Sequence, residues 1–595
     1  MNRLAKPFVG AVLLSCAICC GISLAQERTD SRRWVLQGAT VIDGSGGPAL
    51  PEAVIVIEDD RIQSVGAKGA AYPADATVLD LPGKFVIPGL IDSHTHYEEW
   101  MGEVFLNHGV TSAMGVNKNF GKKMRDHSQQ SQVRSPRIYD TAGTPNLSPS
   151  MTEEQVRNTI REWLKADPDF ARLRDFAEGS ERMYQWATEE IHRNGLLVFG
   201  HTANAPVSTR AGQDVVEHVW GFVLAQMSPQ ERDEFQRGRH WHWGPFIRDW
   251  NRLDAMIKEA VERGAYLNPT LVYELGSLSP LAAKHEMDDY RLYSDPLLMA
   301  YYPRNISESL LQKHRQIRNF SGKYENLVLI SRLTAAEAQE FRRGYPLVLE
   351  FIKRWVRAGG KIQAGTDSIS GGSPGLSLHH EMELLVEAGL TPMQALQAAT
   401  LWSAEILGKN GPKNSPKIGV IAPGTLADLV VLSADPSKDI TNTRKIERVL
   451  KGGRWIELGY TPDYFSFTRP SRSIDMPTPV PLLSAIAPHT VLEGSPEFEM
   501  VLEGVGFVGN SVVRVDGISV PTTFLDPRKL KVRVPASAVE RATPNDFDAP
   551  GPEQKTGVFG DRTVPITVYN APPEGGTSNT IVLRIKPKWM AEGSR

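Results

Sequence analysis

The fold is decided by the stretch Val86-Ile87-Pro88-Gly89-Leu90-Ile91-Asp92-Ser93-His94-Thr95-His96, in which an apolar strand leads directly into two histidines. Residues two apart in a strand point to the same side, so His94 and His96 can face one ion. Neutral imidazoles suit zinc and similar divalent metals. This pair alone is a weak signal, because surface histidines also occur at this spacing by chance.

Three further polar residues stand at the ends of short apolar runs. They are His201 after residues 196–200, His218 after residues 214–217 and Asp367 after residues 361–366. A βα barrel builds its site at the carboxyl ends of several strands. A single histidine at a strand end is more often structural, but four strand ends in this order favour a metal centre. Its potential ligands are His94, His96, His201, His218 and Asp367.

Residues 85–405 alternate strand-like apolar runs with amphipathic helical stretches, which is typical of a βα barrel or another parallel α/β sheet. The pattern predicts helices over Met151–Lys165, Glu181–Asn194, Trp250–Arg263 and Thr391–Ile406. A helix-rich stretch over 277–357 contains no obvious strand. It indicates an insertion into the α/β core.

Both flanks of this region are rich in short strands. Residues 33–84 and 406–458 are predicted to pair into one small sheet domain. Residues 459–480 are predicted to form a linker, because they are rich in proline, serine and arginine. Residues 481–587 show about a hundred residues of short strands separated by Gly, Pro and Asn, which predicts an Ig-like sandwich.

In combination these motifs resemble the amidohydrolase superfamily of metal-dependent hydrolases, and within it the imidazolonepropionase-like and prolidase-like branch. The matching text is Pro88–His96, His108–Ser112, Ala364–Ser368, Gly389–Thr400 and Gly419–Leu432. The resemblance covers about residues 33–458. It implies a distorted TIM (β/α)8 barrel over 85–405 and a composite β-sandwich from 33–84 and 406–458.

The resemblance also implies roles for the site residues. His94 and His96 would bind the more buried metal together with Asp367. His201 and His218 would bind a second metal or touch the substrate. Asp367, with His218 as the second catalytic candidate, would take the proton from the metal-bound water, in agreement with the way a metal and a carboxylate activate water. The implied reaction is hydrolysis of an amide, dipeptide-like or cyclic amide C–N bond.

One departure concerns the strand-4 lysine that two-metal relatives carboxylate to bridge their ions. Its counterpart here is Arg172, whose guanidinium stays protonated and would repel a second ion. One ion is therefore favoured, with zinc as the expected metal by ligand type, although two remain open. A non-catalytic binding or adhesion protein on a degenerate barrel also remains open. So does a one-metal deaminase, although Asn204 stands where deaminases usually have glutamate.

Other residues are weaker candidates. Arg172 and Tyr273 are possible substrate contacts, and Tyr273 follows residues 268–272, which are predicted to be a strand. His379-His380-Glu381 begins a predicted helix after Asp367. The aromatic and basic run over 239–243 is predicted to be a loop. Histidines without site context, among them His192 and His285, are predicted to lie at the surface.

The segment 481–587 resembles the IPT/TIG Ig-like domain through residues 481–488, 502–507, 513–517 and 564–570. It contains no convergent acid, base or metal group. The resemblance predicts contact with another domain or with a partner at the cell surface. A packed appendage that stabilises the enzyme is an equal alternative.

The first 25 residues predict a signal peptide, with Arg3 and Lys6 before an apolar run that ends at Ser23-Leu24-Ala25. The run is short for a membrane span, although an N-terminal anchor or a lipid on Cys16 is an alternative. The chain's three cysteines, Cys16, Cys19 and Cys20, all lie in this segment, which excludes a disulfide scaffold beyond it. The protein is therefore expected to be exported, to the periplasm or beyond. The net charge of -3 gives no support to nucleic-acid binding, and the expected partner is a small-molecule substrate.

Overall fold

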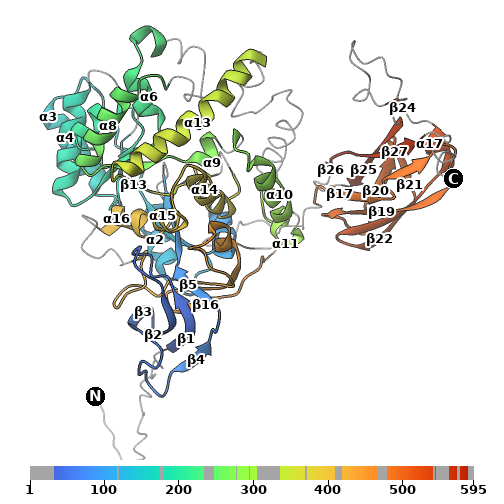
Figure 1. The fold of residues 1–595 in the computed structure, drawn as a ribbon, viewed down its shortest axis with the longest axis horizontal. Coiled ribbons are helices and arrows are strands. Elements are labelled where there is room, and N and C mark those ends of the chain that lie inside the picture. The colour runs from blue at the N-terminus through green and yellow to red at the C-terminus, as the bar shows by residue number, and fades with distance from the viewer. Residues whose placement is uncertain are drawn as a thin grey trace, which may run out of the picture.

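The structure is a computed structural model, and the fold is shown in Figure 1. The residues that it describes are 32–116, 120–173, 180–232, 247–275, 278–293, 295–303, 335–368, 372–408, 418–461, 464, 479–540, 543–544, 562–571 and 576–586. The predicted signal peptide and Cys16 lie outside them, as do the run 239–243 and most of the predicted linker.

One mixed sheet joins the two flanks of the α/β region. Its strand order is β16-β15-β14-β5-β1-β2-β3, with β4 paired to β1. The antiparallel pair of β5 with β14, in which Val86 lies opposite Val431, brings the two flanks together. Alternate residues of these strands fill an apolar cluster that includes Leu36, Ile55 and Leu429. The strands are β1 (Arg33–Val41), β2 (Leu50–Glu58), β3 (Arg61–Gly66), β4 (Thr77–Asp80), β5 (Phe85–Pro88), β14 (Leu429–Leu432), β15 (Ile446–Lys451) and β16 (Arg454–Ile456).

Eight parallel strands follow one another in chain order and form two sheets, β6-β7-β8 and β9-β10-β11-β12-β13. Hydrogen bonds cross both gaps between the sheets. Asp169 N donates to Asp140 O at 2.9 Å on one side, and a parallel bridge joins Thr95 to Ser368 on the other. The strands are β6 (Leu90–Thr95), β7 (Val110–Gly115), β8 (Arg137–Asp140), β9 (Ala171–Arg172), β10 (Val198–Gly200), β11 (Val215–Glu217), β12 (Tyr266–Asn268) and β13 (Lys361–Ile362).

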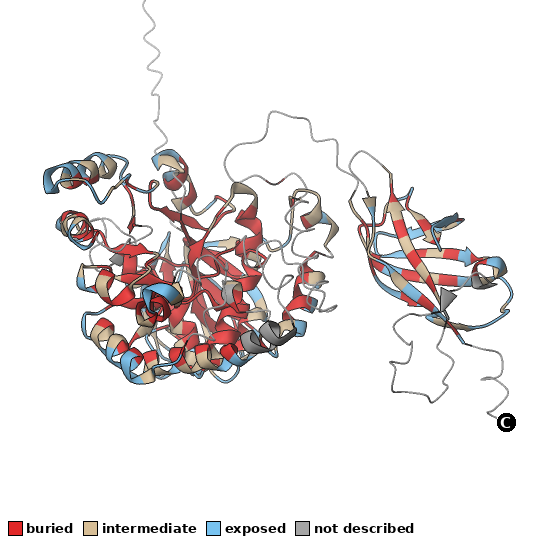
Figure 2. Ribbon diagram, turned by 90° about the horizontal axis from the view of Figure 1, so that it is seen from above, coloured by how far each residue is buried: buried red, intermediate tan, exposed pale blue. Residues whose placement is uncertain are grey.

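Helices surround these strands, which form the buried interior drawn red in Figure 2. Apolar faces at helical spacing explain their packing, as with Leu253, Ile257 and Ala260 of α8. The helices are α1 (Gly102–Asn107), α2 (Gly121–Gln129), α3 (Glu153–Leu164), α4 (Glu181–Arg193), α5 (Ala205–Arg210), α6 (Trp220–Gln226), α8 (Trp250–Glu262), α9 (Leu271–Glu274), α10 (Ala282–Leu292), α11 (Pro296–Met299), α13 (Ala335–Arg357), α14 (Leu376–Glu387), α15 (Pro392–Ala398) and α16 (Leu401–Gly408).

Two helical predictions differ from the structure. The stretch 277–357, predicted as an insertion, ends in α13, whose Phe351 and Trp355 are fully buried in the main core. This helix therefore belongs to the α/β core, as the helix that precedes β13. The single helix predicted over Thr391–Ile406 is two helices, α15 and α16, with Thr400 between them. There Thr400 Oγ1 donates to Leu396 O at 2.7 Å, a side-chain bond that competes with helical hydrogen bonding.

The described residues between 482 and 586 form two sheets around one apolar cluster, with one short helix, and are called the all-β unit below. The sheet orders are β17-β19-β23-β22 and β18-β27-β25-β20-β21. Alternate side chains, such as Leu530 and Val532 of β23, point into the cluster between the sheets. The elements are β17 (Leu482–Ala487), β18 (Thr490–Leu492), β19 (Phe498–Val505), β20 (Val512–Val515), β21 (Ile518–Val520), β22 (Thr522–Asp526), β23 (Lys529–Val534), α17 (Ala536–Glu540), β24 (Thr543–Pro544), β25 (Arg562–Asn570), β26 (Gly576–Thr577) and β27 (Ile581–Lys586).

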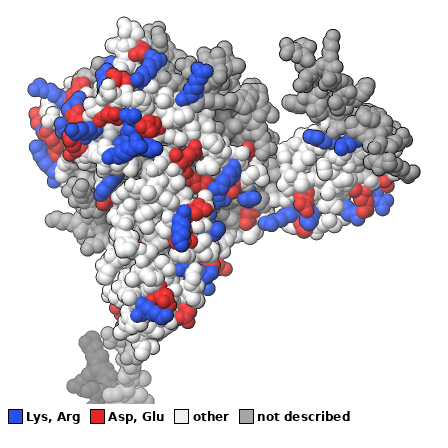
Figure 3. Space-filling view, in the orientation of Figure 1, with Lys and Arg blue, Asp and Glu red and all other residues white. Residues whose placement is uncertain are grey.

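Two surface properties bear on function. Over the part of the chain that the structure describes, no helix combines the length and apolarity needed to cross a bilayer. Basic and acidic side chains are interspersed over the face seen in Figure 3. That face shows no basic stripe of the kind that binds nucleic acid.

Candidate metal centre

All five predicted ligands lie at the carboxyl ends of the parallel strands. His94 is in β6 and His96 follows it, while His201 and His218 come directly after β10 and β11. Asp367 follows β13 by a short extended segment. The carboxyl ends of parallel strands meet at one edge, and the structure brings these side chains together there.

His94, His96 and Asp367 form the first cluster of ligand atoms. Asp367 Oδ1 lies 2.9 Å from His96 Nε2 and 3.6 Å from His94 Nε2. The His94 side chain is 1% exposed, whereas that of His96 is 31% exposed. Solvent therefore reaches the cluster on the side of His96.

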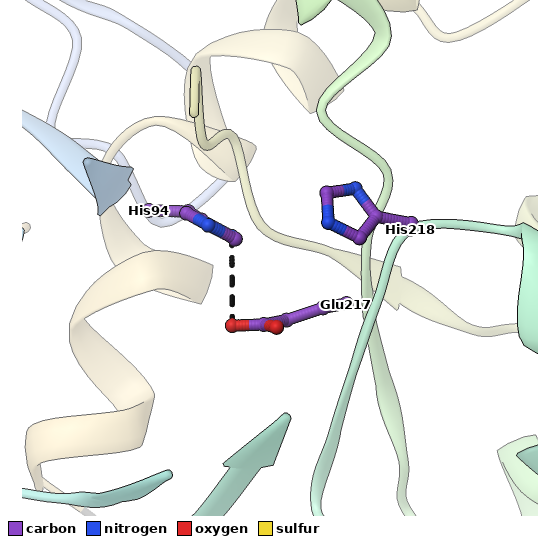
Figure 4. Close-up of side chains that lie close together, drawn as sticks. All are labelled: His94, Glu217 and His218. Atoms are coloured by element: carbon purple, nitrogen blue, oxygen red, sulfur yellow. Dashed lines mark ion pairs between the residues drawn. The ribbon is translucent and has the colours of Figure 1, made fainter. Parts of the chain in front are cut away.

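Glu217 is a site residue that the sequence analysis did not single out. It forms a second group of possible metal ligands with His94 and His218. Its Oε1 lies 3.7 Å from His94 Nδ1, and Figure 4 shows the two side chains facing each other with His218 alongside. The sequence does contain a cue for Glu217, because this residue immediately precedes His218 at the end of the same apolar run.

Arg172 lies at the end of β9 and forms a bidentate ion pair with Glu217. Its Nε donates to Glu217 Oε1 at 2.7 Å and its Nη2 to Oε2 at 2.6 Å. Both residues are buried. Burial alone would raise the pKa of Glu217, but Arg172 foremost, with His201 and His94, holds that pKa well below its usual range. Glu217 is therefore an ionised carboxylate inside the protein.

His201 lies between the charge pair and His218. Its Nε2 is 3.0 Å from His218 Nε2 and 2.9 Å from Glu217 Oε2. Arg172 Nη2 lies 3.2 Å from the same nitrogen. His201 and His218 thus belong to the Glu217 side of the site, next to the cluster of His94, His96 and Asp367.

Backbone strain marks three successive strand ends. His218, Thr270 and Asp367 have φ values of +59°, +45° and +49°. These left-handed conformations are unfavourable for β-branched and other bulky residues, and they cluster at functional sites. They lie one, two and five residues beyond the ends of β11, β12 and β13, respectively.

Buried hydrogen bonds join β6 to the segment that follows β13, next to the metal-ligand candidates. Asp92 accepts from Thr366 Oγ1 at 2.7 Å and from the amides of Thr366 and His94. Burial raises the pKa of Asp92 to about 7. Gly365 allows the close approach, since a Cβ there would lie 2.5 Å from the Cβ of His94. These contacts set His94 and Asp367 at a fixed separation.

The protonation states suit metal binding. Burial lowers the pKa of His94 to about 4 and that of His218 well below its usual value. Both imidazoles are therefore neutral near pH 7 and keep a nitrogen lone pair. Burial would raise the pKa of Asp367, but His94, His96 and His218 outweigh it and hold the value at about 2. Asp367 is accordingly a carboxylate.

The donor set fits a divalent ion. Both ring nitrogens of His94 are buried without a hydrogen-bond partner among the described residues. Leaving such groups unsatisfied costs about 1–3 kcal/mol each, so a ligand for them is expected. Two imidazoles and a carboxylate match the ligands that zinc takes in catalytic sites.

Aromatic rings line the site near His218. The Trp220 ring lies nearly parallel to that of His218, with centroids 6.3 Å apart, and the Tyr273 ring is 6.2 Å from it. Tyr273 was predicted to follow a strand that runs to Val272. The strand ends at Asn268 instead, and Tyr273 lies in α9. It nevertheless reaches the site, as a possible substrate contact requires.

The other histidine candidates belong elsewhere. His379 contacts Thr443 and the carbonyl of His108, and Glu381 accepts the amides of Leu271 and Val272 at the start of α9. The expectation of a surface position for His285 is wrong. Its side chain is 7% exposed, pairs with Glu383 and stacks on His380 at 4.0 Å. The packing of α10 against α14 buries it, and no local pattern revealed that packing.

Comparison with known proteins gives a family match. The model of the Amidohydrolase family matches residues 85–456, which is more than half of the chain. Imidazolonepropionase of Geobacillus kaustophilus (strain HTA426) is 25% identical over 67% of this chain and 88% of its own. N-acyl-D-aspartate deacylase of Alcaligenes xylosoxydans xylosoxydans is 31% identical over 140 residues, and the chain spans only 25% of its length.

Solved structures show the same fold. A putative prolidase from Bifidobacterium longum superposes with a TM-score of 0.50 at 22% identity, over 72% of this chain and 96% of its own. Molinate hydrolase also gives a TM-score of 0.50, at 19% identity, over 75% and 99% of the two chains. These neighbours imply a TIM barrel with a sheet-rich domain.

Proposed function

The chain belongs to the amidohydrolase family, and on that premise we propose that it is a metal-dependent hydrolase that cleaves a C–N bond of a small molecule. The observation that carries the proposal is the cluster of His94, His96 and Asp367 at the strand ends. It combines neutral imidazoles with an ionised carboxylate, and it is reached by solvent through His96. Zinc is the ion that we propose, on the chemistry of these ligands.

The chain's own residues supply the proton transfers. A divalent ion held by His94, His96 and Asp367 would make water nucleophilic near neutral pH and polarise the substrate carbonyl. Asp367 accepts the proton of the attacking water and passes it to the nitrogen as the C–N bond breaks. His218 presents Nε2 toward the site and hydrogen-bonds the substrate. Trp220 and Tyr273 offer apolar contact beside it.

We propose an amide, dipeptide-like or cyclic amide as the substrate class. The names of the relatives support it, since they include a deacylase, an imidazolonepropionase and an enamidase. The eight parallel strands would form the distorted (β/α)8 barrel of such enzymes, and the mixed sheet would belong to their composite β-sandwich.

Hydrolase screening with matched variants tests the proposal. The purified protein is expected to contain stoichiometric metal and to hydrolyse members of a panel of dipeptides, N-acyl amino acids and lactams. His94→Ala and His96→Ala should lose the metal and the activity. His489→Ala is the control, because His489 is an exposed histidine of the all-β unit. Folded protein without metal or turnover would instead indicate a binding protein on this barrel, and release of ammonia would indicate a deaminase.

We also propose that the protein is exported and that its all-β unit is an IPT/TIG-like contact module. The pattern of residues 1–25 supports export, and two sheets around one core support an Ig-like unit. Leu482 and Glu503 of this unit line a groove together with Met287 and Tyr290 of α10, which supports contact between the domains. N-terminal sequencing of the secreted chain should begin at Gln26, or at a lipidated Cys16.

A further inference from the structure

The ion pair of Arg172 and Glu217 plays no part in the proposed hydrolysis, although it lies next to the candidate metal centre. Arg172 is 1% exposed and Glu217 is 0% exposed. A buried pair of this kind costs desolvation energy that its attraction only partly repays, so it is weak evidence for a stabilising role. Its position among possible metal ligands suggests another role.

The guanidinium occupies the place that an ion would need. Glu217, His201 and His218 offer one carboxylate and two imidazoles, a set that binds zinc. Glu217 Oε2 and His218 Nε2 both lie within 3.0 Å of His201 Nε2. Arg172 Nη2 is 2.6 Å from Glu217 Oε2 and 3.2 Å from His201 Nε2. The positive charge of Arg172 therefore already contacts two of these three ligands, Glu217 and His201.

We propose that Arg172 takes the place of a second metal ion, so that the protein holds one ion, at His94, His96 and Asp367. The inference rests on the proposed function, since it presupposes that first ion. A guanidinium cannot give up its proton in a protein, so its charge repels a cation at every working pH. It also engages both carboxylate oxygens of Glu217, which are thereby withdrawn from a metal.

Removal of the guanidinium should create a second metal site. Arg172→Ala leaves the carboxylate of Glu217 buried without its cation, next to His201 and His218. A buried unpaired charge is strongly unfavourable, and a divalent ion can neutralise it. The variant should therefore bind two ions. Arg172→Ala combined with Glu217→Gln removes the charge as well as a ligand and should bind one.

Arg137 provides a matched control. It is a buried arginine that holds Asp428 through two hydrogen bonds, Nε to Oδ2 at 2.8 Å and Nη2 to Oδ1 at 3.1 Å. The neighbours that the structure gives to this pair include Gln129 and Gly452, and none of the five predicted metal ligands is among them. Arg137→Ala breaks a similar buried pair, so it separates the effect of lost packing from the effect on metal binding.

The experiment counts zinc per folded chain by elemental analysis after saturation with zinc and gel filtration, with folding checked by circular dichroism. We expect one zinc in the wild type and in Arg137→Ala, two in Arg172→Ala and one in the double variant. Two ions in the wild type, or one in folded Arg172→Ala, would overturn the inference and leave the proposed function intact. No zinc in the wild type would overturn both.

The wild type alone provides a further test if Arg172→Ala does not fold. Anomalous scattering at the zinc edge from crystals of the zinc-loaded protein should give one peak, between His94, His96 and Asp367. A second peak, or a single peak between Glu217 and His218, would contradict the inference. This readout is independent of activity.

Discussion

Thr270 Oγ1 lies 2.6 Å from His218 Nδ1, and this contact links the residue after β11 to a residue just beyond β12. Both residues have left-handed backbones. The backbone that follows Thr270 is fixed by Glu381. The carboxylate of Glu381 accepts hydrogen bonds from the backbone amides of the next two residues, Leu271 at 3.0 Å and Val272 at 2.7 Å. The ring of His218 is thereby fixed with Nε2 toward His201.

Thr270→Val should weaken the function of His218 without a change of side-chain shape. Loss of a hydrogen bond that orients a site histidine typically costs about 10–100-fold in metal affinity or activity. We expect a fall of that order in kcat/KM for Thr270→Val, whereas Thr270→Ser keeps the hydroxyl and should remain within a few-fold of the wild type. Equal losses in both variants would show that packing, and not the hydrogen bond, is what Thr270 provides.

Asp367→Asn tests the general base. The amide cannot accept a proton, and general-base catalysis contributes about 10²–10⁴-fold. Steady-state kinetics at saturating zinc should therefore show a fall in kcat of at least that size. Elemental analysis checks that the ion is still bound. A metal-loaded Asp367→Asn with more than a tenth of the wild-type kcat would assign the proton transfer to another group.

Metal removal should lower stability. A ligand that binds only the folded state stabilises it by about 2.7 kcal/mol at a hundred times its Kd. Chelator-treated protein should therefore show a higher Tm as zinc is added back, in a concentration-dependent manner. His94→Ala should show no such rise. A Tm that does not respond to zinc in the wild type would argue against a metal at this cluster.

His192 predicts a pH dependence away from the site. Its Nε2 lies 2.8 Å from Asp214 Oδ2, and this hydrogen bond to Asp214 raises the pKa of His192. The folded state therefore binds the proton more tightly than the unfolded state. The resulting stabilisation is complete below about pH 6.5 and is lost as the pH rises through the folded pKa.

His192→Asn removes this contribution. The difference in Tm between wild type and variant should be largest near pH 6 and should shrink as the pH rises through the raised pKa of His192. A difference that grows with pH would reverse the assigned sign of the shift.

Local sequence pattern predicted much of the fold. The helices expected over Glu181–Asn194 and Trp250–Arg263 are observed as α4, Glu181–Arg193, and α8, Trp250–Glu262. Their apolar spacing is a property of the helix alone, so it can be read without knowledge of the neighbours. The strand-end positions of His94, His201 and Asp367 followed for a similar reason, since each ends its own apolar run.

Contacts between elements were not predicted. Glu217 was not predicted as a site residue although it precedes His218. Successive side chains of a strand point to opposite faces, and the sequence does not say which face lines the site. Only the register of β9, β10 and β11 places Arg172 against Glu217. The burial of His285 depends in the same way on α14, which is remote in sequence.

The sequence by itself determined which chemical groups stand at the strand ends, namely imidazoles, a carboxylate and a permanently charged guanidinium. Tertiary structure decided how they are paired: Arg172 with Glu217, 45 residues away, and His218 with Thr270, 52 residues away. The physical reason is that hydrogen bonds and ion pairs require contact within a few ångströms. Such contact between distant residues arises only when the parallel strands align and their carboxyl ends meet.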